Sequence, residues 1–421
     1  MQQTKVRLEY LDGLRGLAAL FVVFHHAFVT FYYAPHALRA GLAPPLAALL
    51  ALLFKSLFTF GHEAVVVFIV LSGYVLMLPI ARTVDGYMPH GVLDYLKRRA
   101  RRILPPYYAA LAFALLIIFC VPGMNRPFHA FWDTAIPITR WATIVSHLLL
   151  IHNHHGWDYA IDPPMWSIAV EWQIYFWFPF LLLPLWRRFG LWATIFCTWL
   201  FGLGGYYLHF GGTYFWLIGD FAFGMAAAAI GFWQADDMRL LRDKVAWGRL
   251  CICFAGIAYL LLIAPSVATY LHLQNNLYLR TFLVSHWHLG TGWEWPTDLL
   301  LGLATACFIV EATHRIQTGL SDNAALRLLH CRYIILLGTF SYSLYLVHFP
   351  ILGLADKLCR VLRLSGERYF AVIFGVGIPA CLVGSYLFHW VFERPFLPTH
   401  LRSGQSVSLE RQAAPARSIH F

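Results

Sequence analysis

Apolar stretches long enough to cross a bilayer recur from one end of the chain to the other, separated by short polar segments. Each is close to the ~20 residues that a transmembrane helix needs. The approximate ranges are 14–34, 57–80, 104–122, 165–186, 191–208, 213–233, 249–271, 297–313, 333–355 and 369–392. The pattern predicts an all-α polytopic membrane protein with about ten transmembrane helices.

The polar segments between these stretches predict the orientation. With the N-terminus in the cytosol, the inner segments hold 21 of the 31 Lys and Arg residues, the outer segments hold nine, and Arg15 lies at the entrance of the first helix. Because cytoplasmic loops retain positive charge, both termini are predicted to be cytoplasmic. Segment 356–368 argues against this, since it is placed outside and carries four basic residues.

Composition narrows the class further. Hydrophobic residues make up 59% of the chain and charged residues 12%, which excludes an ordinary soluble surface. The net charge of +10 is explained by membrane topology, so no nucleic-acid partner is expected. The eight cysteines are scattered without a zinc or disulfide spacing. Residues 1–396 are predicted to form one integral membrane domain, and 397–421 a short polar cytoplasmic tail without fixed structure.

The first apolar stretch ends in a histidine pair, within "LRGLAALFVVFHH" at 14–26. On a helix, Arg15 and His26 fall within about 20° of one face and lie about 16 Å apart along the axis, whereas His25 points about 80° to the other side of Arg15. Ionisable groups at this depth usually face the bundle interior or a water-filled cavity. A core histidine satisfied by neighbouring helices, or a pair marking the outer interface, is the structural alternative.

A basic run, "YLKRRARRILPPYY" at 95–108, precedes the third span on the predicted cytosolic side. Arg99 and Arg102 are one helical turn apart, so both can turn toward one ligand. Guanidinium groups bind phosphate oxygens bidentately, and a cytosolic phosphate-bearing cosubstrate would suit them. A patch that anchors the chain to anionic lipid explains the same residues.

Single polar residues inside other spans complete the candidates. Glu171, in "PPMWSIAVEWQIYFWFPF" at 163–180, is a carboxylate within an apolar helix, and a structural ion pair is its alternative. Trp166 lies at the start of the same stretch. Ser72 and Gly73 allow close helix approach in the second span, and His348 is a second buried histidine that could orient a substrate or another ring.

One outer segment contains a possible metal-binding tract, "HNHHGWD". His152, His154 and His155 could bind a metal, but a short tract in a loop is weak evidence, and a hydrophilic outer loop is favoured. We therefore expect no metal cofactor.

Taken in order, these segments resemble the acyltransferase-3 family of integral membrane O-acyltransferases. The matching pieces are "LDGLRGLAALFVVFHH", "VLSGYVL", "RRARRILP", "WSIAVEWQIYFWFP", "FSYSLYLVHFP" and "FERPF", which together cover roughly residues 8 to 396. The resemblance implies transfer of an acyl group, often acetyl from acetyl-CoA, to a hydroxyl of an envelope or secreted glycan. The implied location is the plasma (inner) membrane.

The family motifs fall on particular residues here. An arginine and a histidine separated by ten intervening residues correspond to Arg15 and His26. An Arg-x-x-Arg pair corresponds to Arg99 and Arg102, although Arg98 with Arg101 has the same spacing. In the fourth span the family commonly has Val-Glu-Glu. This chain has Glu171 at the first glutamate position and Trp172 at the second. The resemblance therefore implies no role for a second carboxylate in this chain.

The expected mechanism combines both lines of reasoning. The arginines hold the acyl-CoA donor, and Arg15 is counted among them. His26 acts as general base on the acceptor hydroxyl, because the pKa of imidazole lies near working pH. Glu171 orients the ring or the acceptor, and Ser72, Trp166 and His348 support the substrate or the fold. A covalent acyl-histidine relay is an open variant. A proton-coupled transporter or glycan flippase that uses the same polar residues is the competing function.

Overall fold

The computed structural model describes residues 8–32, 34, 41–83, 86–125, 140–154, 156–157, 159–270 and 294–398. All regular structure in these ranges is helical. The long helices are α1 (Tyr10–Tyr32), α4 (Gly61–Ala81), α5 (Gly91–Cys120), α8 (Met165–Trp177), α9 (Leu183–Tyr207), α10 (Leu217–Phe232), α12 (Trp247–Tyr270), α14 (Trp295–Thr318), α17 (Ser341–Val361) and α19 (Ile378–Phe388). The predicted all-α class is confirmed for the described part of the chain.

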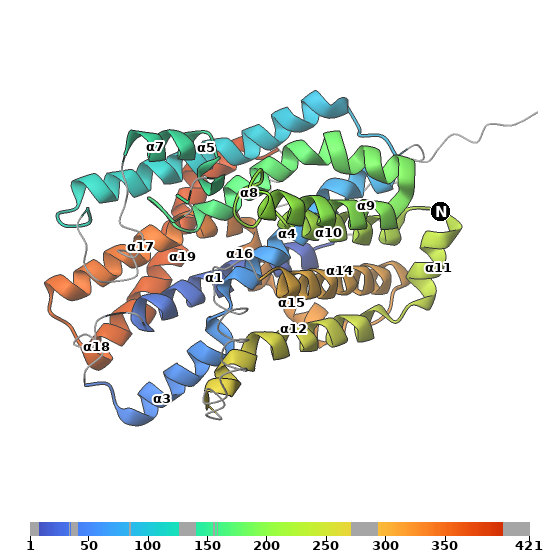
Figure 1. Cartoon of the computed structure of the whole chain (residues 1–421). Coiled ribbons are helices and arrows are strands. Elements are labelled where there is room, and N and C mark those ends of the chain that lie inside the picture. Colours follow the sequence, from blue (N-terminus) through green and yellow to red (C-terminus); the bar gives the residue numbers. More distant parts are fainter. Residues whose placement is uncertain are drawn as a thin grey trace, which may run out of the picture.

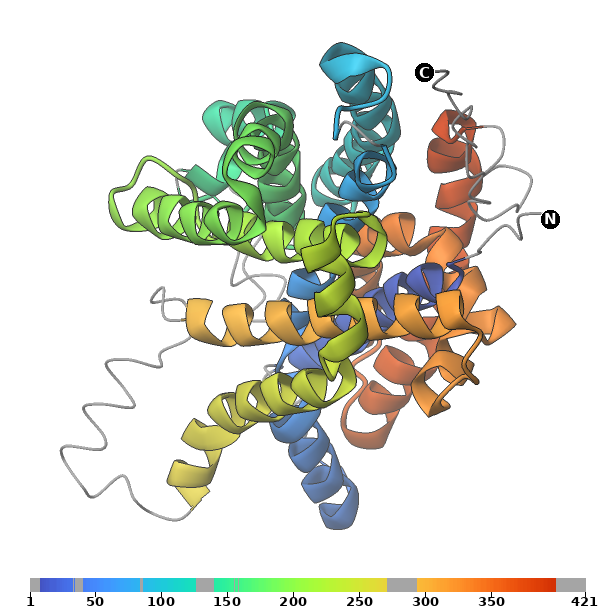
Figure 2. The ribbon, with the colours of Figure 1, turned by 90° about the vertical axis from the view of Figure 1, so that its right-hand side faces the viewer.

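Shorter elements connect or extend these helices. They are α3 (Pro44–Leu53), α7 (Trp141–Leu148), α11 (Asp236–Lys244), α15 (Ala324–Leu329), α16 (Arg332–Thr339), α18 (Gly366–Phe370), the π-helices η1 (Phe54–Phe58), η3 (Phe178–Leu182), η5 (Ala371–Gly377) and η6 (His389–Glu393), and the 3-10 turns η2 (His152–His154) and η7 (Arg394–Phe396). Figure 1 shows α3 at the edge of the bundle. In Figure 2, α14 (gold) crosses the middle of the molecule, and α12 (yellow) lies next to it.

Among the described residues, length and apolar character identify six helices that can cross a membrane, and up to eight if each of two bent pairs counts as one span. The predicted number of ten therefore stays a prediction, as does the orientation of the termini. One of the six, Met165–Tyr207, contains a break at Gly190 (φ 81°, ψ −173°). That position separates two spans that the sequence predicts, and only glycine adopts such a backbone conformation readily.

The backbones of α4 and α10 are in direct contact. A Cβ atom on Gly73 would lie 2.0 Å from the carbonyl oxygen of Phe221, and a Cβ atom on Gly224 would lie 1.9 Å from that of Val70. No side chain can be accommodated at either point. The close helix approach expected at Gly73 is thus present, with α10 as the partner.

Helix α1 lies in the middle of the bundle, between α4 and the α16–α17 pair (Figure 1). It packs closely at its first turns, where a Cβ atom on Gly16 would lie 2.5 Å from the carbonyl oxygen of Ile334. Helices α5 and α17 are also in contact. Side chains from α1, α4, α5, α8 and α17 therefore meet in one interior region.

Candidate active site

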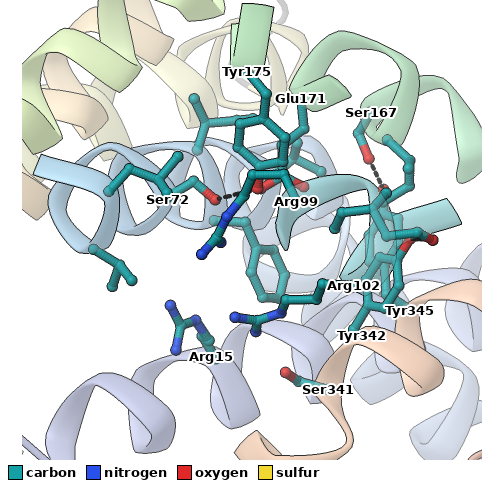
Figure 3. A pocket seen from close by; sticks show the side chains of 17 residues that line it. Arg15, Ser72, Arg99, Arg102, Ser167, Glu171, Tyr175, Ser341, Tyr342 and Tyr345 are labelled. Atoms are coloured by element: carbon teal, nitrogen blue, oxygen red, sulfur yellow. Dashed lines mark hydrogen bonds between the residues drawn. The ribbon is translucent and has the colours of Figure 1, made fainter. Parts of the chain in front are cut away.

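A cavity lies where these five helices meet, and it gathers most of the polar residues predicted from the sequence (Figure 3). Its volume of about 90 Å³ is several times what one water molecule needs. The polar lining residues are Arg15, Ser72, Arg99, Arg102, Ser167, Glu171, Tyr175, Ser341, Tyr342 and Tyr345. Four distant segments of the sequence that were predicted to be functional are therefore brought to one place.

Three guanidinium groups converge on one end of the cavity. Arg15 comes from α1, and Arg99 and Arg102 come from adjacent turns of α5 (Figure 3). Arg15 also donates to Asp12 at 3.2 Å, whereas Nε of Arg99 is buried without a hydrogen-bond partner in the described part of the chain. Arg98 is half exposed and pairs with a carboxylate on its own helix. Of the two pairs with this spacing, Arg99 and Arg102 line the cavity, whereas Arg98 and Arg101 do not.

Glu171 faces these arginines across the cavity. Its Oε1 atom accepts hydrogen bonds from the Ser72 hydroxyl of α4 and from the Tyr175 hydroxyl at 2.5 Å. Tyr175 lies four residues further along α8, so the two side chains share one helix face. The carboxylate is therefore held in place by two donors, and its negative charge partly balances the guanidinium groups.

The cavity is elongated along α4. Its α4 lining runs from Val65 to Leu76, a helical rise of about 16 Å. Ser72 lies toward the arginine end, and Phe68, Val65, Ser167 and Tyr345 lie toward the other. The Tyr345 and Ser167 hydroxyls are hydrogen-bonded at 2.7 Å. One end is thus cationic, and the other is lined by aromatic, aliphatic and hydroxyl groups.

His26 is absent from the residues that line this cavity and lies instead against α17. Its Nδ1 atom is 3.0 Å from Nε2 of His348 and 3.1 Å from the carbonyl oxygen of Val22. His348 is fully buried, and its ring centroid lies 5.9 Å from that of Tyr345, which borders the cavity. The histidine pair therefore lies behind Tyr345.

The hydrogen bonds of the two histidines define their tautomers. Nδ1 of His348 lies 2.9 Å from the Leu344 carbonyl oxygen, which only accepts, so this nitrogen carries the proton. In a neutral ring, Nε2 of His348 is then an acceptor, and Nδ1 of His26 must donate to it. Nδ1 of His26 can also donate to the Val22 carbonyl. The lone pair of a neutral His26 is consequently on Nε2.

His25 occupies a different environment from its neighbour. Its Nδ1 atom is 2.6 Å from the Phe58 carbonyl oxygen, and its ring fills the space beside Gly61 at the start of α4. These contacts join α1 to α4. They agree with the divergence of the two adjacent side chains that helix geometry predicts.

Trp166 packs against His62, a residue that the sequence analysis did not single out. The ring centroids are 5.5 Å apart with an interplanar angle of 15°. His62 in turn lies 2.9 Å from the Asp298 carboxylate. Because Asp298 is 236 positions further along the chain, no local pattern could have revealed this pair.

The predicted metal tract separates into different environments. His152 is buried and stacks on His147 of α7, with ring centroids 4.0 Å apart. Burial, and to a smaller extent the neighbouring imidazole, together lower the pKa of His152 to about 3. His154 lies 3.1 Å from the Gln173 amide oxygen, and His155 lies outside the described residues. In the described ranges, three or more potential metal ligands do not converge at any point.

Several residues that line the cavity were not predicted from the sequence. These are Ser167, Tyr175, Ser341, Tyr342 and Tyr345. The i, i+4 spacing from the carboxylate would have placed Tyr175 on the same helix face. The others needed knowledge of which helix faces the bundle interior.

Comparison with known proteins identifies the class. A family model described as an acyltransferase domain (Acyl_transf_3) matches residues 8–390, and the chain belongs to this family. It is thus a membrane-embedded acyltransferase, which confirms the resemblance seen in the sequence.

One curated relative is similar along nearly the whole chain. The acyltransferase MdmB of Streptomyces mycarofaciens is 25% identical over 411 residues, which cover 93% of this chain and 92% of the relative. No solved structure matches the chain.

Proposed function

We propose that the protein transfers an acyl group, acetyl in the simplest case, from acyl-CoA to a hydroxyl group of an envelope or secreted glycan at the plasma membrane. The observation that carries this proposal is the elongated cavity with three guanidinium groups at one end and a histidine pair behind the other. The arginine-to-histidine separation of about 16 Å along α1 suits a donor with an anionic head and a long, nearly uncharged arm.

The arginine end would hold the donor. Arg15, Arg99 and Arg102 present planar donors from two helices toward one space, and phosphate oxygens accept such bonds bidentately. With both termini in the cytosol, as the sequence predicts, this end would face the compartment that contains acyl-CoA. Glu171 and its two hydroxyl donors would fix the distance between the guanidinium groups and the arm.

His26 would act as general base. Its Nε2 lone pair withdraws the proton from the acceptor hydroxyl as the oxygen attacks the thioester carbonyl. The carbon–sulfur bond then breaks, and the imidazolium returns the proton to the leaving thiolate. His348 holds the Nδ1 proton of His26 in place, as the orienting partner does in other nucleophile–base pairs.

The donor site is tested with the purified protein in lipid nanodiscs and radiolabelled acetyl-CoA. Arg99→Ala and Arg102→Ala are each expected to weaken binding about 10- to 100-fold, since a hydrogen bond to a charged group is worth ~1.5–3 kcal/mol. Arg98→Ala is the matched control, because this residue is exposed and pairs within its own helix. Unchanged binding in the first two variants would refute the donor site and favour a transport function.

Transfer itself is tested by comparing surface glycans from cells with and without the gene by mass spectrometry. An added acetyl mass that depends on the gene supports the proposal. If purified protein binds acetyl-CoA but the glycans are identical, the acceptor class is wrong.

A further inference from the structure

A second histidine–carboxylate pair lies outside the site described above. Asp298 is fully buried, and its Oδ2 atom lies 2.9 Å from Nε2 of His62 and accepts from Nε1 of Trp216 at 2.8 Å. Because a carboxylate only accepts, Nε2 of His62 carries a proton. Nδ1 of His62 has no hydrogen-bond partner among the described residues. Nδ1 of His62 is thus the one nitrogen of this imidazole that remains available to a ligand.

Aromatic rings fix the plane of this imidazole. Trp166 lies nearly parallel to it, and the Tyr214 ring centroid is 4.7 Å away. Trp166 and Tyr214 also contact each other, with ring centroids 4.4 Å apart. The His62 side chain keeps 20% of its surface exposed. It is therefore rigidly held and still accessible to a ligand.

The pair lies just beyond one end of the cavity. His62 precedes Val65 on α4 by three residues, about 4.5 Å of helical rise, and Trp166 directly precedes Ser167 on α8. Val65 and Ser167 both line the cavity. The three arginines occupy the opposite end, so His62 lies on the side away from the proposed donor phosphates.

We infer that His62, held by Asp298 and bordered by Trp166 and Tyr214, is the acceptor-binding subsite and takes a hydroxyl group, for example that of a pyranoside. This inference rests on the proposed function and deepens it. A hydroxyl group can donate to or accept from Nδ1, so it is bound in either protonation state of the imidazole. Trp166 and Tyr214 are themselves buried and hold the imidazole in place, so recognition is carried by the hydrogen bond to Nδ1. His62 is a positioning residue, and no bond is made or broken on it.

The test uses purified protein, acetyl-CoA and methyl α-D-glucopyranoside as the probe acceptor, with CoA release and the ester product measured together. His62→Gln keeps an amide donor for Asp298 and removes the Nδ1 position. It is expected to raise the KM for the glycoside about 5- to 10-fold, the effect of one hydrogen bond. The KM for acetyl-CoA should stay within a factor of two.

The chain provides a matched control pair. His330 lies 2.8 Å from Asp322 and is similarly exposed at 27%, and neither residue lines the cavity. His330→Gln should leave both KM values unchanged. If His62→Gln alters neither KM, or raises that for acetyl-CoA equally, the pair is only a structural clamp between α4 and α14 and the inference is wrong.

A second measurement does not depend on a variant that folds. Diethyl pyrocarbonate modifies accessible histidines, and peptide mass spectrometry reports each site. The glycoside should slow modification of His62 and not of His330. Absence of this protection overturns the inference. If acetyl-CoA also fails to bind, the proposed function itself fails, whereas binding with no effect of the glycoside removes only the acceptor assignment.

Discussion

Replacing His348 by alanine is expected to slow acyl transfer far less than replacing His26. His26 Nδ1 has two acceptors, His348 Nε2 at 3.0 Å and the Val22 carbonyl oxygen at 3.1 Å. Without His348, the carbonyl still favours the tautomer with its lone pair on Nε2. The loss is therefore one hydrogen bond, ~0.5–1.5 kcal/mol, or about 2- to 10-fold in kcat.

The assay is transfer from radiolabelled acetyl-CoA in proteoliposomes, with kcat and the KM for the donor determined separately. His348→Gln is the conservative variant, because its amide oxygen can accept from His26 and should restore part of kcat. Both variants should keep the donor KM, since the arginine end is distant. A loss for His348→Ala as large as that for His26→Ala would show that His348 itself touches the acceptor and would refute the assigned roles.

Three further outcomes are expected. His26→Ala should lower kcat about 10²- to 10⁴-fold, the range for a general base, with acetyl-CoA binding intact, while His25→Ala should be milder; similar losses in both would contradict the assignment. Gly73→Ala should destabilise the fold by at least about 1–3 kcal/mol in thermal unfolding, because its Cβ atom would overlap a backbone carbonyl of α10, and an unchanged midpoint would disprove this close contact. Acidification should destabilise the region around His152: its folded pKa lies below the usual ~6.5, so the unfolded chain binds the proton first and roughly 2 kcal/mol is lost at pH 5. The melting temperature of the wild-type protein should therefore fall as the pH is lowered to 5. His152→Phe should reduce this fall, and His154→Gln should not. An equal fall in the wild type and both variants would show that another group is responsible.

The positions of the helices could be predicted because each is an apolar run bounded by polar residues. Every one of the ten predicted ranges overlaps a helix, but in the part of the chain that the structure describes, length and apolar character alone support six to eight spans. The difference arises where helices bend or break, as at Gly190 and between α16 and α17. Hydrophobicity along the chain does not report such breaks.

The candidate site was partly predictable for the same reason. A charge within an apolar helix must face the protein interior, so Arg15, Arg99 and Glu171 could be expected to converge. Helix geometry also placed Arg15 and His26 on one face, but it could not show that α17 approaches α1 at the level of His26. Contacts between distant helices, such as His62 with Asp298, depend on tertiary packing that has no local signal.

The backbone contact between α4 and α10 has a mechanical consequence. With no layer of side chains between Gly73 and Phe221, or between Gly224 and Val70, these two helices cannot slide past each other without atoms colliding. The two helices therefore form a rigid unit, and Ser72 of α4 belongs to it. Any change of cavity shape that admits a substrate is therefore expected in the walls formed by α5 and α17 rather than in the wall formed by α4.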